Sequence, residues 1–406
     1  MRLVSLICAL ALSATGAQAA GARWLGSWAA SPAPPMAAPA NSPARGTPTF
    51  NNQTLVQTVR LSAGGQRLRL RLTNEYGTHP LAVGAARVAL VGADGAAVAG
   101  SDRAVTFDGA KAASLAPGAP LISDPVALPT TALGKVSISL YLPADTNGCT
   151  CHMSGSEVVQ VSSGDTTATP PPAMAPSPAA PTYRAFLSAV EVETSAAPAP
   201  VIVAFGDSIT DGYQSTTGAN RRWPDRLAER LAAKSPGRPI GVNNAGIGGN
   251  RVLSDGVIAI FGQSAMSRFD RDVLSVPGVT HVIVLEGVND LGASKTAPPS
   301  AESLIGGYRQ LIARAHAHGL KIIGATVLPY GGAGYYGAPG EAERQKINTW
   351  IRTGHEFDGV IDLDAAVRDP ARPERMKAEL QSGDWLHPND AGYKVMGDAV
   401  DLALFR

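Results

Sequence analysis

Hydrophobic and polar residues alternate with a period of two along much of the first half of the chain. The strictest example reads Arg-Leu-Arg-Leu-Arg-Leu at residues 67–72. Such alternation is typical of strands with one buried face and one solvated face. We therefore expect an antiparallel β-sandwich or jelly roll before about residue 195. Its strand-like runs are residues 54–61, 67–72, 81–90, 136–141, 157–162 and 183–192.

After residue 200 the pattern changes to short apolar runs that alternate with amphipathic stretches. This alternation predicts an α/β domain with a parallel sheet covered by helices on both faces, a three-layer architecture. The apolar runs predict strands at residues 201–206, 239–244, 280–286, 320–327 and 359–363. The amphipathic stretches predict helices near residues 223–234, 263–275, 300–318, 340–353 and 389–404.

The boundary between the two patterns is marked by composition and by one last strand. The Pro/Ala/Thr-rich tract at 166–181 resembles a linker, but residues 186–192 alternate like a final strand of the β-domain. We therefore expect a β-domain at 20–195, an α/β domain at 196–406, and a long surface loop at the Pro-rich tract.

The first residues have the pattern of a bacterial signal peptide. A short basic start precedes an apolar core and the small-x-small sequence Ala17-Gln-Ala19. This pattern predicts cleavage after Ala19, so residues 1–19 would be removed and the protein would be secreted or periplasmic. No later stretch reaches eighteen uninterrupted apolar residues, so no transmembrane anchor is expected.

Length, charge and cysteine content exclude several classes of protein. The 406 residues, 45% of them apolar, are enough for two hydrophobic cores. The net charge of +1, without a Lys/Arg cluster, argues against a nucleic-acid partner. Cys149 and Cys151 could close into a small ring or remain thiols, and with His152 they lack the spaced second pair of a zinc site. We expect no metal. The sequence indicates no oligomeric state.

Two short segments far apart in the chain carry the residues of nucleophilic catalysis. Ser208 follows the buried run at 201–205, where a tight turn would expose its hydroxyl. Asp384 and His387 are three residues apart, so one turn would let the carboxylate orient the imidazole. Alone, Ser208 could equally be a helix N-cap and His387 part of a solvated turn.

Two further segments supply groups that suit a tetrahedral oxyanion. Residues 243–250 and 286–290 each follow a strand-like run and are rich in glycine and asparagine. The backbone N–H groups of Ser208 and Gly249 and the side chain of Asn289 would make three donors. The alternative is that these glycines serve turns and that Asn289 caps a helix. The Gly-Ile-Gly-Gly sequence at 246–249 lacks the dinucleotide-binding spacing, so no cofactor is implied.

With these four segments the chain resembles the SGNH, or GDSL, hydrolase superfamily. The matching blocks are Gly-Asp-Ser-Ile at 206–209, Gly-Ile-Gly-Gly-Asn at 246–250, Gly-Val-Asn-Asp at 287–290 and Asp-Trp-Leu-His at 384–387. The resemblance implies a flavodoxin-like fold with Ser208 as nucleophile, His387 as base and Asp384 as its orienter. It also implies Ser208, Gly249 and Asn289 as oxyanion donors, where Gly249 is preferred to Gly248 because it precedes the polar Asn250.

The N-terminal half is also similar to known proteins. Trp-Leu-Gly-Ser-Trp-Ala-Ala-Ser-Pro at 24–32 and Arg-Leu-Thr-Asn-Glu-Tyr-Gly at 71–77 resemble the β-domain of bacterial exported SGNH esterases found among hemicellulose-degrading enzymes. The resemblance implies a serine esterase that removes short acyl groups, above all O-acetyl groups from carbohydrates. A β-sandwich occurs with many functions, so it does not by itself indicate sugar binding. We expect Trp24 and Trp28 in the core or between the domains.

Four further residues are expected to shape the substrate pocket, and two other functions stay open. Tyr335 and Tyr336, on a Gly-rich loop, are candidates for a wall that stacks on a sugar or aryl group, and Arg251 and Asp290 would lie behind it. One alternative is an arylesterase, thioesterase or lysophospholipase, although no unusually apolar loop indicates a long acyl groove. The other is a carbohydrate-binding protein without catalysis.

Overall fold

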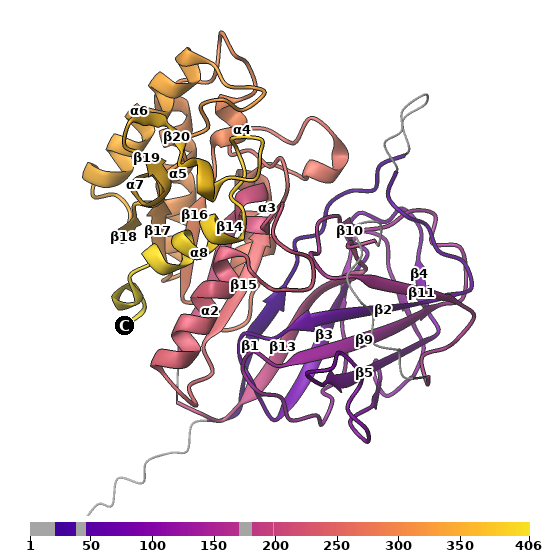
Figure 1. Cartoon of the computed structure of the whole chain (residues 1–406). Helices are drawn as coiled ribbons and strands as arrows, with labels where there is room; N and C mark the ends of the chain where they lie inside the picture. The colour runs from indigo at the N-terminus through magenta and orange to yellow at the C-terminus, as the bar shows by residue number, and fades with distance from the viewer. Residues whose placement is uncertain (1–20, 38–45, 170–180, 198) are drawn as a thin grey trace, which may run out of the picture.

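The computed structural model describes residues 21–37, 46–169, 181–197 and 199–406. The predicted signal peptide and most of the Pro-rich tract at 166–181 lie outside these residues. Figure 1 shows a lobe of strands, coloured indigo to magenta, beside a lobe of helices and strands, coloured pink to yellow. Strand β1 of the first lobe lies against strand β15 of the second, so the lobes are in contact.

The N-terminal lobe contains two larger antiparallel sheets. One has the order β1 (Arg23–Ala29), β13 (Leu187–Thr194), β3 (Arg67–Thr73) and β8 (Pro120–Ile122). The other has the order β11 (Val159–Ser163), β2 (Gln53–Arg60), β9 (Lys135–Leu142), β5 (Ala85–Val91) and β6 (Arg103–Val105). Two short pairs of strands complete the lobe: β4 (Leu81–Val83) with β7 (Ala113–Leu115), and β10 (Cys151–His152) with β12 (Arg184–Ala185).

The two larger sheets share one hydrophobic core, which explains the alternation of their sequences. In β3 the leucines at 68, 70 and 72 are fully buried, whereas the alternating Arg67 and Arg69 pair with Glu193 and Glu191. Ile138 and Leu140 of β9 belong to the same core cluster. Burial of alternate leucines supplies the apolar surface that stabilises both sheets.

Strand β1 was not predicted from the sequence, because both of its faces are covered and its residues do not alternate. Gly26 lies at a bulge in its pairing with β13. A Cβ atom there would lie 2.6 Å from Val276 Cγ1, so the close approach of the second lobe requires glycine. Trp28 is buried in the core, and the guanidinium of Arg69 lies 4.3 Å from the ring centre of the half-buried Trp24.

The C-terminal lobe is built on a five-stranded parallel sheet, as the sequence predicted. Its order is β15 (Gly241–Gly246), β14 (Val201–Gly206), β16 (His281–Leu285), β17 (Lys321–Ala325) and β18 (Gly359–Ile361). Every residue of β14 and β16 is buried, which requires cover on both faces of the sheet. Strand β15 begins and ends two residues later than expected, so residues 243–246 lie in the strand and the glycine-rich turn follows it.

Helices cover this sheet in packed pairs, α2 with α8 and α5 with α6 (Figure 1). The helices are α1 (Ser208–Asp211), α2 (Trp223–Lys234), α3 (Ala265–Phe269), α4 (Val288–Leu291), α5 (Ala301–Ala317), α6 (Ala338–Thr353), α7 (Leu363–Val367) and α8 (Asp390–Ala399). Helix α3 continues into a π-helical turn, η2 (Asp270–Leu274), and three 3-10 turns are η1 (Ala259–Phe261), η3 (Ala378–Leu380) and η4 (Leu402–Phe405). Strands β19 (Arg368–Asp369) and β20 (Arg372–Met376) form a hairpin. In the part of the chain that the structure describes, no helix is long and apolar enough to cross a membrane.

Candidate active site

Ser208 begins the one-turn helix α1 directly after the central strand β14. The N-cap of this helix is Asp207, whose Oδ1 accepts a hydrogen bond from the Ile209 N–H at 2.9 Å. Capping is therefore supplied by the neighbouring aspartate and leaves the Ser208 hydroxyl available for another partner. The turn closes at Gly212, which has a left-handed φ of 91°.

The structure brings Ser208, His387 and Asp384 together in one chain of hydrogen bonds. Ser208 Oγ lies 2.8 Å from His387 Nε2, and His387 Nδ1 lies 2.6 Å from Asp384 Oδ2. The other Asp384 oxygen accepts from the backbone N–H groups of His387 and Leu386, each at 2.9 Å. These bonds fix the carboxylate, and because a carboxylate only accepts, His387 carries its proton on Nδ1 and offers Nε2 to the serine.

The surroundings of this group keep the imidazole neutral. Burial lowers the pKa of His387 below 6.5 and outweighs the opposing effect of Asp384. Burial alone would raise the pKa of Asp384, but the hydrogen bonds from His387 lower it overall, so the carboxylate is ionised. A neutral imidazole beside an ionised carboxylate is the protonation state that a general base requires.

Gly249 follows β15 and has the backbone conformation that favours glycine, with a φ of 74°. A Cβ atom at this position would lie 2.5 Å from the ring of Phe261, whereas one at Gly248 would meet nothing within 4 Å. Both the dihedral angle and the close approach therefore distinguish Gly249 from its neighbour.

The amide of Asn289 lies at the start of α4 but does not cap that helix, whose N-cap is Gly287. Its Nδ2 donates to the Asn250 carbonyl at 2.9 Å, and its Oδ1 accepts from the Tyr335 hydroxyl at 3.2 Å. The tyrosine thus fixes the orientation of the amide. An amide nitrogen has two N–H donors, so one remains beyond the bond to Asn250.

A buried arginine that the sequence analysis missed joins the loops of the site. The guanidinium of Arg268 donates to the carbonyls of Gly206 and Ala245, to Asn250 Oδ1 and to Glu286 Oε1. These partners lie at the carboxyl ends of three neighbouring strands. Arg268 lies four residues before Asp272, which is in the π-helical turn, and the two side chains form an ion pair at 2.9 Å. A single side chain therefore sets the spacing of three loops around Ser208.

Several carboxyl groups lie buried behind the same loops, and burial raises their pKa values. Burial raises the pKa of Asp207 to about 7 and that of Asp290 to about 6, and it raises the pKa of Glu286 well above its usual range. Asp290 accepts from the Val252 N–H at 2.8 Å, which anchors the loop after Gly249. The charge of Arg251 lowers the pKa of Asp290 against the effect of burial.

The two tyrosines expected to form a stacking wall are packed against the core. The rings of Tyr335 and Tyr336 lie 6.0 Å and 5.3 Å from that of the buried Tyr330. Tyr213, which was not predicted, is instead 46% exposed, and its ring centre lies 4.7 Å from that of His387. Only the folded chain brings Tyr213 to His387, since 174 residues of sequence separate them.

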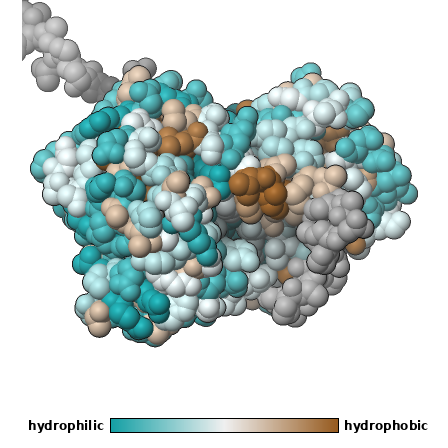
Figure 2. All heavy atoms as spheres, turned by 90° about the horizontal axis from the view of Figure 1, so that it is seen from above, coloured by the Kyte–Doolittle hydropathy of each residue, from teal (hydrophilic) through white to brown (hydrophobic). Residues whose placement is uncertain are grey.

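An apolar loop that the sequence analysis did not recognise lies beside Gly249. Val257 is 68% exposed and Ile258 39% exposed, and they directly precede Phe261, whose ring contacts the Gly249 backbone. Figure 2 shows a brown, hydrophobic patch in the hollow between the two lobes. An exposed apolar loop beside Gly249 is a candidate contact surface for an apolar part of a substrate.

Comparisons with known proteins find matches to the C-terminal lobe. The model of the GDSL-like lipase/acylhydrolase family matches residues 204–395. The search of curated proteins found no match. Both the nucleophile block and the Asp384 to His387 segment lie inside the matched region.

Solved structures resemble about half of the chain. A carbohydrate acetylesterase family member from Sinorhizobium meliloti shares 17% identity over 49% of this chain and 94% of its own, with a TM-score of 0.41. An acetyl xylan esterase from Geobacillus stearothermophilus shares 20% over 49% and 92%, with a TM-score of 0.38. The psychrotrophic esterase EstA from Pseudoalteromonas shares 19% over 49% and 93%, with a TM-score of 0.36. The family match alone carries the comparison: residues 204–395, in the C-terminal lobe, match the model of a GDSL-like lipase/acylhydrolase domain.

Proposed function

We propose that the protein hydrolyses carboxylic esters through an acyl-serine intermediate. The observation that carries the proposal is the unbroken hydrogen-bond chain from Ser208 through His387 to Asp384. His387 takes the serine proton as the hydroxyl attacks the ester carbonyl, and Asp384 stabilises the imidazolium that forms. The imidazolium then gives the proton to the leaving alcohol, and water releases the acid by the reverse sequence.

The oxyanion of the tetrahedral intermediate would be held by three donors. These are the backbone N–H groups of Ser208 and Gly249 and the free N–H of the Asn289 amide. Their positions are set before substrate binds, because Arg268, Tyr335 and Asp290 fix the loops that carry them. Donors fixed in advance stabilise developing charge without the cost of reorganisation.

We expect turnover of p-nitrophenyl acetate with a pH profile set by His387. Because burial holds the pKa of His387 below 6.5, the imidazole stays neutral above that pH, and kcat/KM should be flat there. Below its pKa, protonation removes the base, so kcat/KM should fall about tenfold per pH unit. Initial rates between pH 4 and 9 measure this limb. An Asp290→Asn variant should show the same fall of kcat/KM at low pH. Loss of this fall in the variant would assign the titration to Asp290 instead.

For the substrate, we propose short acyl esters, in particular O-acetyl groups on carbohydrates. Tyr213, exposed beside His387, offers a ring face on which a sugar or aryl alcohol could stack. On p-nitrophenyl esters the rate should peak at acetate or propionate and fall by octanoate, because further methylenes would find no enclosed apolar surface. Hydrolysis of acetylated xylan, pectin and sialic acid then tests which alcohol carries the acyl group in the substrate.

A second candidate is an arylesterase, thioesterase or lysophospholipase with the same chemistry. The exposed Val257 and Ile258 near Gly249 favour it, because they provide the apolar surface that a larger acyl or aryl group needs. A rate maximum at eight carbons or longer that shifts to short esters in a Val257→Ser variant would support this candidate. The same substitution at the exposed Val98, in the N-terminal lobe, is the matched control.

We further propose that the lobes are separate domains, with a β-sandwich at 20–195 and the hydrolase at 196–406. In support, β13 ends at Thr194, β14 begins at Val201, and the two larger sheets of the first lobe share one core. We propose removal of residues 1–19 on export and a secreted or periplasmic location. A protein purified from the medium or periplasm whose first residue is Ala20 would establish both.

A further inference from the structure

The N-terminal lobe places a histidine against the helix that carries Ser208. His152, on β10, lies with its Nε2 2.9 Å from Asp211 Oδ1, and its Nδ1 lies 3.0 Å from the Ser31 carbonyl. Both residues of the pair are buried, with side chains that are 7% and 2% exposed. The Ser31 carbonyl and the Asp211 carboxylate oxygen both accept, so a protonated imidazole would donate to both. Burial alone would lower the pKa of His152, but Asp211 raises it overall.

Asp211 is the last residue of helix α1, which Ser208 begins. Its N–H donates to the Asp207 carbonyl at 2.9 Å and closes the only turn of that helix. A helix of four residues has little stability of its own, so its position depends on the groups that anchor it. The second oxygen of Asp211, Oδ2, has no hydrogen-bond partner among the described residues. Without His152 the buried carboxylate would lose its bond to the N-terminal lobe, which is costly.

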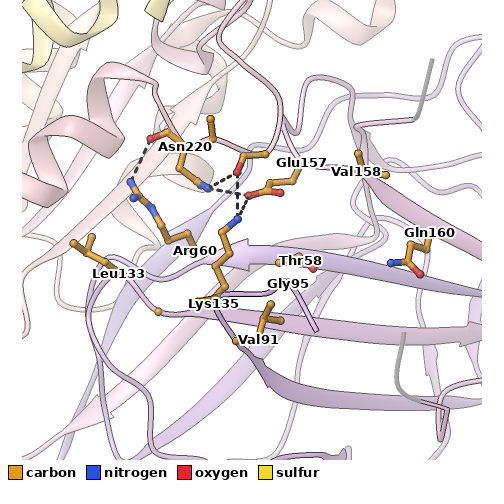
Figure 3. A pocket seen from close by; sticks show the side chains of 15 residues that line it. Thr58, Arg60, Val91, Gly95, Leu133, Lys135, Glu157, Val158, Gln160 and Asn220 are labelled. Carbon is orange, nitrogen blue, oxygen red and sulfur yellow. Dashed lines mark hydrogen bonds and ion pairs between the residues drawn. The ribbon is translucent and has the colours of Figure 1, made fainter. Parts of the chain in front are cut away.

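The segment that follows α1 is held by the same part of the N-terminal lobe. The Gly218 N–H donates to the Ser156 carbonyl at 2.9 Å. Glu157 Oε1 accepts from Asn220 and from Lys135, each at 2.9 Å, and Figure 3 shows these side chains converging beside a groove. Residues 152–157 therefore make three hydrogen bonds to residues 211–220, and the disulfide between Cys149 and Cys151 restrains the chain just before His152.

We propose that His152 is a positioning residue of the esterase active site, contributed by the N-terminal domain. The inference rests on the proposed function. Through Asp211, His152 holds the turn whose first residue supplies both the nucleophile and one oxyanion N–H. Tyr213, two residues beyond Asp211, packs on His387, so the same anchor also sets the contact between this segment and the base. Misplacement of reacting groups by about 1 Å can cost about 100-fold in rate.

The test is a set of variants of the full-length protein, assayed with p-nitrophenyl acetate. His152→Leu should lower kcat about 100-fold and leave KM within about twofold, because the substrate-binding surface is untouched. His152→Gln keeps an N–H donor toward Asp211 and should recover most of the lost rate. After Asp211→Asn, His152→Leu should have little further effect on kcat, because the two residues act as one unit.

Ser62→Ala is the control for a general loss of contact between the lobes. Its hydroxyl accepts from the Val242 N–H at 2.8 Å across the same boundary but touches no part of α1. It should lower the unfolding temperature and leave kcat unchanged. A His152→Leu protein with wild-type kcat would overturn the inference. An equal loss of kcat in His152→Leu and in Ser62→Ala would also overturn it. If His152→Leu does not fold, an unchanged kcat in Asp211→Asn would overturn the inference instead.

A second readout separates this inference from the proposed function. The rate at which diethyl p-nitrophenyl phosphate modifies Ser208 should fall in His152→Leu in parallel with kcat, because it reports the position of the nucleophile. If the wild-type protein turns over esters and this rate is unaffected by His152→Leu, only the positioning role is wrong. If the wild-type protein neither hydrolyses esters nor reacts, the proposed function is wrong and the inference with it.

Discussion

Replacement of Ser208 by alanine should abolish esterase activity and leave the fold intact. The hydroxyl is 2.8 Å from His387 and does not cap α1, whose cap is Asp207. Its removal therefore costs little stability but deletes the atom that forms the covalent intermediate. We expect kcat to fall at least about 1,000-fold. Initial rates on p-nitrophenyl acetate and a thermal unfolding curve measure the two effects separately.

Ser215→Ala is a matched control for this prediction. It deletes the same hydroxyl group seven residues further on, where Ser215 Oγ is buried and has no hydrogen-bond partner among the described residues. Activity should stay within about twofold of the wild type, since no bond is lost. A folded Ser208→Ala protein with near-normal turnover would remove Ser208 as the nucleophile, and modification by an organophosphate would then identify the serine that acts instead.

The parallel sheet and the position of Ser208 at its carboxyl edge could be predicted because both follow from local patterns. Buried strands read as uninterrupted apolar runs, and the carboxyl ends of parallel strands share one edge of the sheet. Residues that follow different strands are therefore brought together whatever their distance in sequence. The segment with Asp384 and His387 follows no strand of this sheet, and here the order of the blocks carried the prediction.

Features that depend on contact between distant segments could not be predicted in this way. Arg268 reads as an ordinary polar residue of an amphipathic helix, yet its partners include a carbonyl 62 residues away. His152 reads as a weak metal ligand beside two cysteines, and its partner Asp211 belongs to the other lobe. Strand β1 was not predicted for a related reason, since the second lobe covers the face that would otherwise be polar.

Tyr335 shows the same limit at the level of one side chain. A tyrosine in a Gly-rich loop indicates an exposed ring, and the loop was assigned a role in contact with substrate. The structure buries much of the ring and directs its hydroxyl to Asn289 Oδ1 at 3.2 Å. Burial raises the pKa of Tyr335 well above its usual range, so the hydroxyl is protonated at neutral pH and can donate. Tyr335 thus acts on the amide that would bind the oxyanion.

Replacement of Asn289 by alanine should lower kcat about 100-fold and change KM little. The amide N–H that remains beyond the bond to Asn250 would meet negative charge only when the carbonyl oxygen becomes an oxyanion. An interaction made in the transition state alone affects kcat and not ground-state binding. Full kinetic curves on p-nitrophenyl acetate, with enzyme concentration fixed by titration of Ser208, separate the two constants.

Two companion variants distinguish charge stabilisation from loop support. Asn289→Asp keeps the shape but places a carboxylate beside the oxyanion, so it should be at least as damaging as Asn289→Ala. Tyr335→Phe removes the hydroxyl that orients the amide but keeps the donor, and kcat should fall less than about tenfold, as for one hydrogen bond. A rise in KM with unchanged kcat in Asn289→Ala would make the residue a ground-state binding group. Equal losses in Asn289→Ala and Tyr335→Phe would instead show that the amide acts by holding the Asn250 loop in place.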